Sequence, residues 1–249
     1  MTEEVKYLFS GDCALTMEFG NEINPQTNNR VRKVVDLLEK TNINGILDWI
    51  PTYRSILLRY NPLVISNYQL INELRRLENP KDQKEFIAPL VTEIPMVYGG
   101  QHGPDLEYVA SHNNLSVEDV IRIHNEKNYL IYMMGFTPGF PYLGGMSESI
   151  ATPRLKSPRE KIPGGSIGIA GTQTGIYPID SPGGWQLIGK TPVRLFDPDK
   201  KEPFLLRAGD YLRFVPINEE EFNQIELQVF QNDYKITRYS LKDGDHNAN

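Results

Sequence analysis

The stretch GFTPGFPYLGG, residues 135–145, opens the part of this 249-residue chain that decides its fold. Between residues 135 and 192 lie 12 of the chain's 20 glycines and 8 of its 18 prolines, so regular elements there must be short. Apolar segments bounded by these turn residues are predicted as strands at Ser166–Ala170, Pro192–Phe196 and Tyr211–Pro216. Short strands joined by long ordered loops favour a closed or nearly closed, mainly-β barrel over residues 91–240.

The sequence before this region has a different pattern, in which strands alternate with amphipathic helices. Strands are predicted at Val5–Ser10, Ala14–Phe19, Ile46–Ile50 and Ser55–Arg59, and helices after Pro25 and after the N-cap Ser66. Residues 1–90 are therefore predicted to form an α+β domain, an antiparallel sheet with two helices on one face. The polar segment Asn79–Glu85 is the predicted linker, and residues 241–249 are predicted as a disordered tail.

The composition is that of a globular protein and excludes several classes of function. Cys13 is the only cysteine, so an intrachain disulfide and a cysteine-based metal site are both excluded. The N-terminus has no basic segment followed by an apolar one, and no long apolar run could span a membrane, which predicts a cytoplasmic protein. The net charge of −6 argues against nucleic acid as a partner, and no membrane partner is expected.

The charge is uneven, because residues 150–196 carry six basic and only two acidic side chains. Four of the basic residues, in the proline-broken stretch PRLKSPREKIPGG, are Arg154, Lys156, Arg159 and Lys161. Arginine held in a fixed backbone frame suits the recognition of carboxylate or phosphate, which makes these residues candidates for anion binding. The alternative is a solvated basic edge that prevents aggregation between strands.

Aromatic side chains alternate with glycine and proline in the loop of residues 135–145. Prolines hold such a loop still, so Phe136, Phe140 and Tyr142 could form an apolar pocket wall; equally, they could plug the end of the barrel. Further along, the neutral hydrogen-bonding side chains suited to an amide or lactam are Gln173, Thr174, Tyr177 and Gln186. The succession of glycine-rich loops around them points to a binding site in this region.

His124 ends the predicted helix Ser116–Asn125 and is the candidate for a general base. The alternative is a packed histidine, or one that interacts with the C-terminus of its helix. The four histidines do not have the spacing of metal ligands, and the sequence contains no H-E-x-x-H motif, so no metal is expected.

Three stretches carry a specific resemblance to a known family. They are YGGQHGPDL at residues 98–106, GFTPGFPYLGGM at 135–146, and PRLKSPREKIPGGSIGIAGTQTGIYPIDSPGGWQLIGKTP at 153–192. Together with His124 they resemble the allophanate hydrolase subunit 1 family, most specifically over Tyr98–Pro192. The resemblance implies a small α+β N-terminal domain and a cyclophilin-like barrel as the C-terminal domain.

The same resemblance implies a function. It implies a subunit 2-family partner and a third, lactam-utilisation protein, which together form an ATP-dependent 5-oxoprolinase that converts 5-oxo-L-proline to L-glutamate. ATP is expected to be bound with or by the partner subunit, and the isolated chain is expected to be inactive. In such a site the four basic residues would meet anionic groups, the neutral residues would meet the lactam or the partner surface, and His124 would carry a proton. The alternative is an inhibitor of the autophosphorylation of a sensor histidine kinase.

Overall fold

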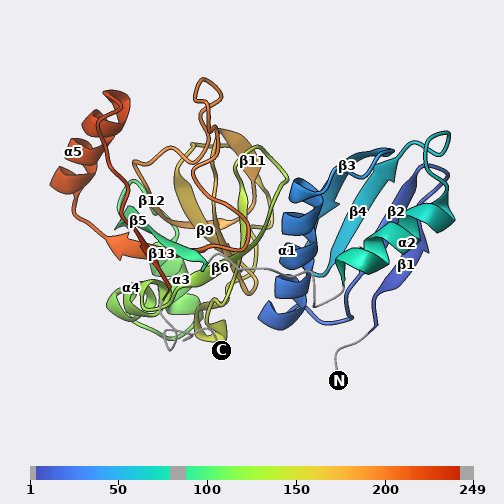
Figure 1. Cartoon of the computed structure of the whole chain (residues 1–249). Helices are drawn as coiled ribbons and strands as arrows, with labels where there is room; N and C mark the ends of the chain where they lie inside the picture. The colour runs from blue at the N-terminus through green and yellow to red at the C-terminus, as the bar shows by residue number, and fades with distance from the viewer. Residues whose placement is uncertain (1–3, 79–87, 242–249) are drawn as a thin grey trace. The chain divides into compact units, whose positions relative to one another are not determined.

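The computed structural model describes residues 4–78 and 88–241 and divides into two compact units, residues 1–87 and 88–249 (Figure 1). The predicted linker Asn79–Glu85 lies outside the described residues, and so does the predicted tail apart from Leu241. Each unit has its own hydrophobic core, so each is described by itself as unit 1 and unit 2.

Unit 1 consists of a four-stranded antiparallel sheet and two helices. The strands are β1 (Lys6–Phe9), β2 (Ala14–Glu18), β3 (Ile46–Pro51) and β4 (Ser55–Tyr60), and the helices are α1 (Pro25–Lys40) and α2 (Asn67–Leu77). The strand order is β1-β2-β4-β3, and each neighbouring pair is antiparallel. The α+β domain predicted from the sequence is therefore confirmed.

Local sequence signals set the start of both helices. The side chain of Asn24 accepts a hydrogen bond from the backbone N–H of Thr27, and Pro25 occupies the first turn of α1. In α2 the N-cap Ser66 and Gln69 satisfy each other's backbone N–H groups in a capping box. The buried apolar residues of each helix recur every three or four positions, so each helix contributes one stripe to the core of unit 1.

Unit 2 is built on an eight-stranded sheet that curls into a nearly closed barrel. Its strands are β5 (Leu90–Tyr98), β6 (Tyr129–Met134), β7 (Pro141–Gly144), β9 (Ser166–Ala170), β10 (Gln173–Ile176), β12 (Gln186–Lys190), β13 (Tyr211–Pro216) and β14 (Arg238–Ser240). Neighbours follow the order β10-β9-β12-β5-β13-β6-β7, with β14 paired to β5, and only β5 and β13 are parallel within this described sheet. The two ends of the order, β7 and β10, lie side by side, which confirms the predicted mainly-β barrel.

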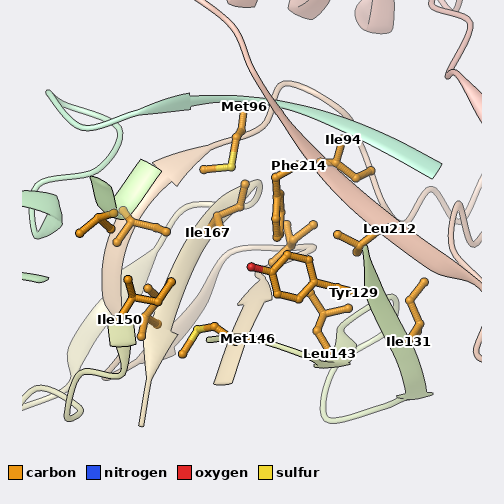
Figure 2. Packing of buried hydrophobic residues seen from close by; sticks show 14 of the residues in the cluster. Ile94, Met96, Tyr129, Ile131, Leu143, Met146, Ile150, Ile167, Leu212 and Phe214 are labelled. Carbon is orange, nitrogen blue, oxygen red and sulfur yellow. The ribbon is translucent and has the colours of Figure 1, made fainter. Parts of the chain in front are cut away.

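Short elements surround the barrel. The helices are α3 (Leu106–His112), α4 (Val117–Asn125), the short η2 (Glu148–Ile150) and α5 (Glu219–Phe230), and a separate two-stranded ladder joins β8 (Arg159–Ile162) to β11 (Ser181–Gly183). Large apolar side chains fill the interior, among them Met96, Tyr129, Ile167 and Phe214 (Figure 2). Because this interior is a packed core, the functional side chains are to be sought in the loops at its rim.

The predicted strand Pro192–Phe196 was wrong. Pro192 has no N–H to donate to a ladder, and the N–H of Val193 bonds to the side-chain hydroxyl of Thr191 instead of to a neighbouring strand. Phe196 forms a single isolated bridge with Phe204. The apolar run therefore packs as a turn-rich connection, because proline and a local side-chain bond compete with the ladder.

Replacing Gly103 by alanine is expected to lower the free energy of unfolding of unit 2 by about 2 kcal/mol. A Cβ at Gly103 would overlap with the backbone of Ile188 and Gly189 in β12, and these backbone atoms cannot rotate away. The matched control is Gly184→Ala, whose Cβ would meet its nearest atoms at 3.7 Å, an ordinary contact. Urea unfolding measures both variants, and equal losses would contradict the close approach at Gly103.

Candidate functional site

The basic segment, residues 153–161, is tied to the SPGGWQ stretch by hydrogen bonds. The backbone N–H of Leu155 donates to the carbonyl of Gly184 at 2.7 Å, and Nε2 of Gln186 donates to the carbonyl of Pro153 at 2.8 Å. Gln186 is buried, so its amide serves this contact within the chain. The segment is thereby held along its length, in spite of having little regular structure.

Arg159, one of the predicted anion-binding residues, already holds a carboxylate of its own chain. Its guanidinium donates to the two carboxylate oxygens of Asp105 at 2.8 and 2.9 Å, and to the carbonyl of Trp185 at 3.1 Å. Asp105 also accepts a hydrogen bond from the backbone N–H of Leu187 at 2.6 Å. The Arg159 and Asp105 side chains are 29% and 14% exposed, so a largely buried ion pair joins the basic segment to β12.

Sequence reasoning missed Asp105, although the residue stands in the YGGQHGPDL stretch. Its place directly before α3 is typical of an N-cap, yet its side chain makes no capping hydrogen bond. The carboxylate reaches instead to a guanidinium 54 positions away in the sequence. No local pattern indicates such a pair, because only the folding of the barrel brings the two residues together.

Of the other three basic residues of the segment, one forms an ion pair and two do not. Lys161 forms a surface ion pair with Asp180 at 2.8 Å. This ion pair, together with a hydrogen bond that Asp180 accepts from the backbone N–H of Gly164, lowers the pKa of the Asp180 carboxyl. Arg154 and Lys156 are exposed, and within residues 4–78 and 88–241 neither forms an ion pair or a hydrogen bond. Arg154 and Lys156 are therefore the cations of the basic segment that stay exposed without an ion pair among the described residues.

The aromatic loop, residues 135–145, divides into buried and exposed side chains. Phe140 makes edge-to-face contacts with Tyr177 and Trp185 in a small buried cluster, and Tyr142 packs against it. Phe136 is 71% exposed and has a φ of +65°, a left-handed conformation that is strained for a bulky residue. Phe140 therefore plugs a core, whereas Phe136 is held toward solvent at a cost in backbone strain.

Tyr177 connects the aromatic cluster with the basic segment. Burial raises the pKa of Tyr177 to about 12, against the opposing effect of Arg154 and Arg159 nearby. The phenol is thus a neutral hydroxyl at neutral pH. Gly183 lies directly against this hydroxyl, since a Cβ there would overlap with it.

His124 lies in the last turn of α4, and its whole side chain is buried. Its Nδ1 lies 2.7 Å from the hydroxyl of Tyr98, its Nε2 lies 2.9 Å from that of Thr174, and its ring stacks on Phe214. The Thr174 hydroxyl donates its one proton to the carbonyl of Gly168, so Nε2 carries the imidazole proton and Nδ1 accepts from Tyr98. Burial lowers the pKa of His124 to about 3, which keeps the ring neutral.

This arrangement favours the packed histidine over the proton carrier, because the imidazole reaches no surface. Thr174, one of the residues predicted to meet a lactam, is buried with it. Tyr177 and Gln186 are buried as well, so Gln173 at the start of β10 is the half-exposed member of that group. The structure therefore brings the predicted residues to one region, but it places most of the neutral ones behind the surface.

Two short stretches match the sequence patterns of known motifs but do not adopt the backbone conformation that these motifs require. GWQLIGKT, residues 184–191, has the pattern of a phosphate-binding loop, but it forms β12 and is followed by a turn-rich connection where the motif requires a helix. GGSIG, residues 164–168, has the pattern of a nucleophile turn, but Ser166 is buried inside β9. Neither stretch supplies a phosphate cradle or an exposed nucleophile.

Residues 4–78 and 88–241 contain neither a cluster of metal-ligating side chains nor a membrane-spanning helix. In them no three His, Cys, Asp or Glu side chains gather closely enough to hold a metal ion. Nor does any helix there combine the length and the apolar character needed to cross a membrane.

Comparison with known proteins covers nearly the whole chain. The chain is 46% identical over 223 residues to a protein from Bacillus subtilis that is named as a subunit of 5-oxoprolinase, and the match spans 86% of this chain and 93% of that one. A protein of the same name from Escherichia coli O157:H7 is 40% identical over 84% of this chain and 94% of its own. These relatives confirm the resemblance that the motifs indicated.

A solved structure and a family model agree with these relatives. A conserved uncharacterized protein from Pyrococcus horikoshii is 46% identical and superposes with a TM-score of 0.52, covering 87% of this chain and 100% of that one. The model of the carboxyltransferase domain, subdomains C and D, matches residues 5–206, which include the basic segment and the aromatic loop. The chain therefore belongs to the family of the carboxyltransferase domain, subdomains C and D.

Proposed function

We propose that this chain is a subunit of an ATP-dependent 5-oxoprolinase, which converts 5-oxo-L-proline to L-glutamate. The observation that carries the proposal is its identity of 46% and 40% to two proteins named as subunits of 5-oxoprolinase, over nearly all of each. The word subunit in both names supports assembly with other chains. The partners we propose are a subunit 2-family protein and a lactam-utilisation protein, with ATP bound with or by the partner subunit.

Opening a five-membered lactam is the chemical problem in this reaction, because the carbonyl of an unactivated amide is a poor electrophile. ATP would supply a phosphoryl group to the lactam oxygen, which makes the carbonyl carbon easier for water to attack. A site for this chemistry needs cations that meet carboxylate and phosphate oxygens, in a place from which bulk water is excluded. The cations are the part of this requirement that the present chain meets with its own residues.

Arg154 and Lys156 are the residues that we assign to the anionic groups of the substrate or of ATP. The hydrogen bonds made by Leu155 and Gln186 hold the backbone between and beyond them. Both side chains are thus presented on a rigid frame, so less freedom is lost when an anion binds. Arg159, which is committed to its ion pair, is assigned to positioning this frame.

The remaining candidate residues are assigned by their burial and contacts. His124 and Thr174 support the barrel from within, and Lys161 is engaged in a surface ion pair with Asp180. Phe136 is the exposed aromatic side chain of the aromatic loop. We assign it to the apolar side of the bound lactam or to the partner surface that covers it.

The test of the proposed function is release of L-glutamate from 5-oxo-L-proline and ATP. We expect none from this chain alone, and we expect release when its subunit 2-family and lactam-utilisation partners are both added. Omitting ATP or any one chain should abolish release. No glutamate from a mixture whose assembly has been verified by mass would overturn the proposal.

Replacing Arg154 or Lys156 by alanine is expected to lower kcat/KM of the assembled enzyme at least tenfold, since a charge-assisted contact is worth about 1.5–3 kcal/mol. The matched control is Lys201→Ala, another exposed base of unit 2 that lies outside the basic segment. Thermal unfolding should be unchanged in all three variants. Full retained turnover of both Arg154→Ala and Lys156→Ala would remove these residues from the site.

The alternative of a sensor histidine kinase inhibitor stays a prediction. The relatives reported above are named for the enzyme, and their names do not favour the inhibitor.

A further inference from the structure

A groove with a volume of about 1020 Å³ lies in unit 2 between α5 and loops of the barrel. Its barrel wall is built from the segments 163–165, 178–180, 190–194 and 196–199. Figure 1 shows α5 at the outer edge of unit 2, beside β12 and β5. None of the described residues that line the groove belongs to the basic segment, so the groove is a separate feature of the surface.

The α5 wall is a helical stripe whose apolar side chains are uncovered. Asn223, Glu226, Leu227 and Phe230 recur at three- and four-residue spacing and line the groove. Leu227 is 57% exposed and Phe230 is 75% exposed, whereas Phe222 is the buried residue of this helix. An uncovered apolar stripe beside a groove is typical of a surface that binds another chain.

Prolines and other apolar residues line part of the opposite wall and make it stiff. Its apolar residues include Pro163, Pro178, Ile179, Pro192, Phe196 and Pro198. Proline fixes the backbone, and Gly165, with a φ of +85°, allows the wall to approach the carbonyl of Thr191 more closely than any side chain would permit. The groove is therefore formed in advance, so that little ordering is needed when it is filled.

Two cations stand on the barrel wall. Arg194 is exposed, and among the described residues it has neither an ion pair nor a hydrogen bond. Lys190 is half-buried, with its Nζ 6.0 Å from the centre of the Phe222 ring. Carboxylates on an occupant would complement these side chains without having to displace a direct partner.

The acidic residues of the groove leave these two cations available. Asp180 is paired with Lys161 at 2.8 Å, with Lys190 acting on it only at longer range, and Asp197 is paired with Lys200 at 3.8 Å. Asp199 is exposed, and Glu226 stands on the opposite, α5 wall. The charges of the groove outside these ion pairs are thus Lys190, Arg194 and Asp199 on the barrel wall and Glu226 on the α5 wall.

We infer that this groove is the docking site for the subunit 2-family partner, which inserts a segment with an apolar face and an acidic edge. The apolar face covers Leu227 and Phe230, and the acidic edge meets Arg194 and Lys190. This inference rests on the proposed function for the identity of the partner. A second copy of this chain is a different occupant, and the experiment below separates the two.

The experiment measures the affinity of the full-length chain for the purified subunit 2-family protein of the same organism by titration calorimetry. We expect Leu227→Asp and Phe230→Asp each to raise Kd at least tenfold. Arg194→Glu is expected to raise Kd at least tenfold and to weaken its dependence on salt concentration. All three side chains are exposed, so the thermal unfolding of each variant should match that of the wild-type chain.

The matched controls introduce an aspartate and a charge reversal at exposed residues that do not line the groove. Gln228→Asp lies on the outer face of α5, and Lys235→Glu is an exposed base beyond the helix. Both should keep Kd within twofold of the wild-type value. Tight binding by all of the groove variants would overturn the docking site and leave the proposed function standing, whereas no binding by the wild-type chain would count against both.

Sedimentation of the isolated chain tests whether a second copy of the chain occupies the groove. We expect Phe230→Asp to leave the mass of the isolated chain in solution unchanged. A wild-type dimer that dissociates on this substitution would assign the groove to a second copy and overturn the inference.

Discussion

Asp105→Ala is expected to lower the free energy of unfolding of unit 2 by about 3 kcal/mol, because it leaves a largely buried guanidinium without its carboxylate. Asp105 holds Arg159 through both of its oxygens and also accepts the backbone N–H of Leu187. Its loss therefore leaves a partly buried guanidinium without its carboxylate and the N–H of Leu187 without its acceptor. Urea unfolding followed by fluorescence measures the effect, since Trp185 reports on unit 2 and Trp49 on unit 1.

The control for this prediction is Lys161→Ala, which breaks a nearby ion pair on the surface. Because both partners there are mostly exposed, the free energy of unfolding should stay within error of the wild-type value. Adding Arg159→Leu to Asp105→Ala should recover part of the lost stability, since the unpaired charge is then gone. Equal losses from Asp105→Ala and Lys161→Ala would show that the Asp105 pair is not buried in solution.

Lowering the pH from 7 to 4.5 is expected to reduce the free energy of unfolding of unit 2 by about 2.5 kcal/mol through His124 alone. The folded pKa of His124 is about 3 and the unfolded value is 6.5, so the unfolded chain takes up a proton first. The contribution of His124 is therefore complete above pH 6.5 and is lost progressively as the pH falls toward 3. The folded chain does not take up this proton in that range, because Nδ1 of the buried His124 already accepts a hydrogen bond from Tyr98.

Two measurements isolate the contribution of His124. In the folded protein its ring signals in NMR should not titrate between pH 7 and 4.5. His124→Gln should flatten the slope of stability against pH if the variant folds, with His112→Gln at an exposed position as the matched substitution. A midpoint near 6.5 for His124 in the folded chain would contradict its burial and would restore it as a candidate proton carrier.

Much of the fold follows from local signals. In unit 1 the caps at Asn24 and Ser66 and the spacing of apolar residues place both helices where the sequence predicts them. In unit 2 the strand predicted at Pro192–Phe196 fails, because a proline and one side-chain hydrogen bond outweigh the apolar pattern. The parallel pairing of β5 with β13 was not predicted, since the residues that it joins are far apart in the sequence.

In the candidate site, too, the sequence predicted the region but not the contacts of the individual residues. The clustering of arginine, lysine, glycine and proline located the region of the basic segment, and the family motifs pointed to the same residues. The roles within it were not readable from residue type. Arg154 and Arg159 look alike in the sequence, but one is exposed and the other is bound to Asp105.

By itself, the sequence determined the two-domain organisation, the α+β and barrel classes and the family, because these depend on composition, periodicity and motifs that act over a few residues. Only the tertiary structure decided that Arg159 is paired, that His124 is sealed inside the barrel and that α5 leaves an apolar stripe beside a groove. Burial and long-range pairing depend on which distant segments meet. The sequence gives the charge and shape of a side chain, but its partner and its access to water depend on the tertiary contacts of the folded chain.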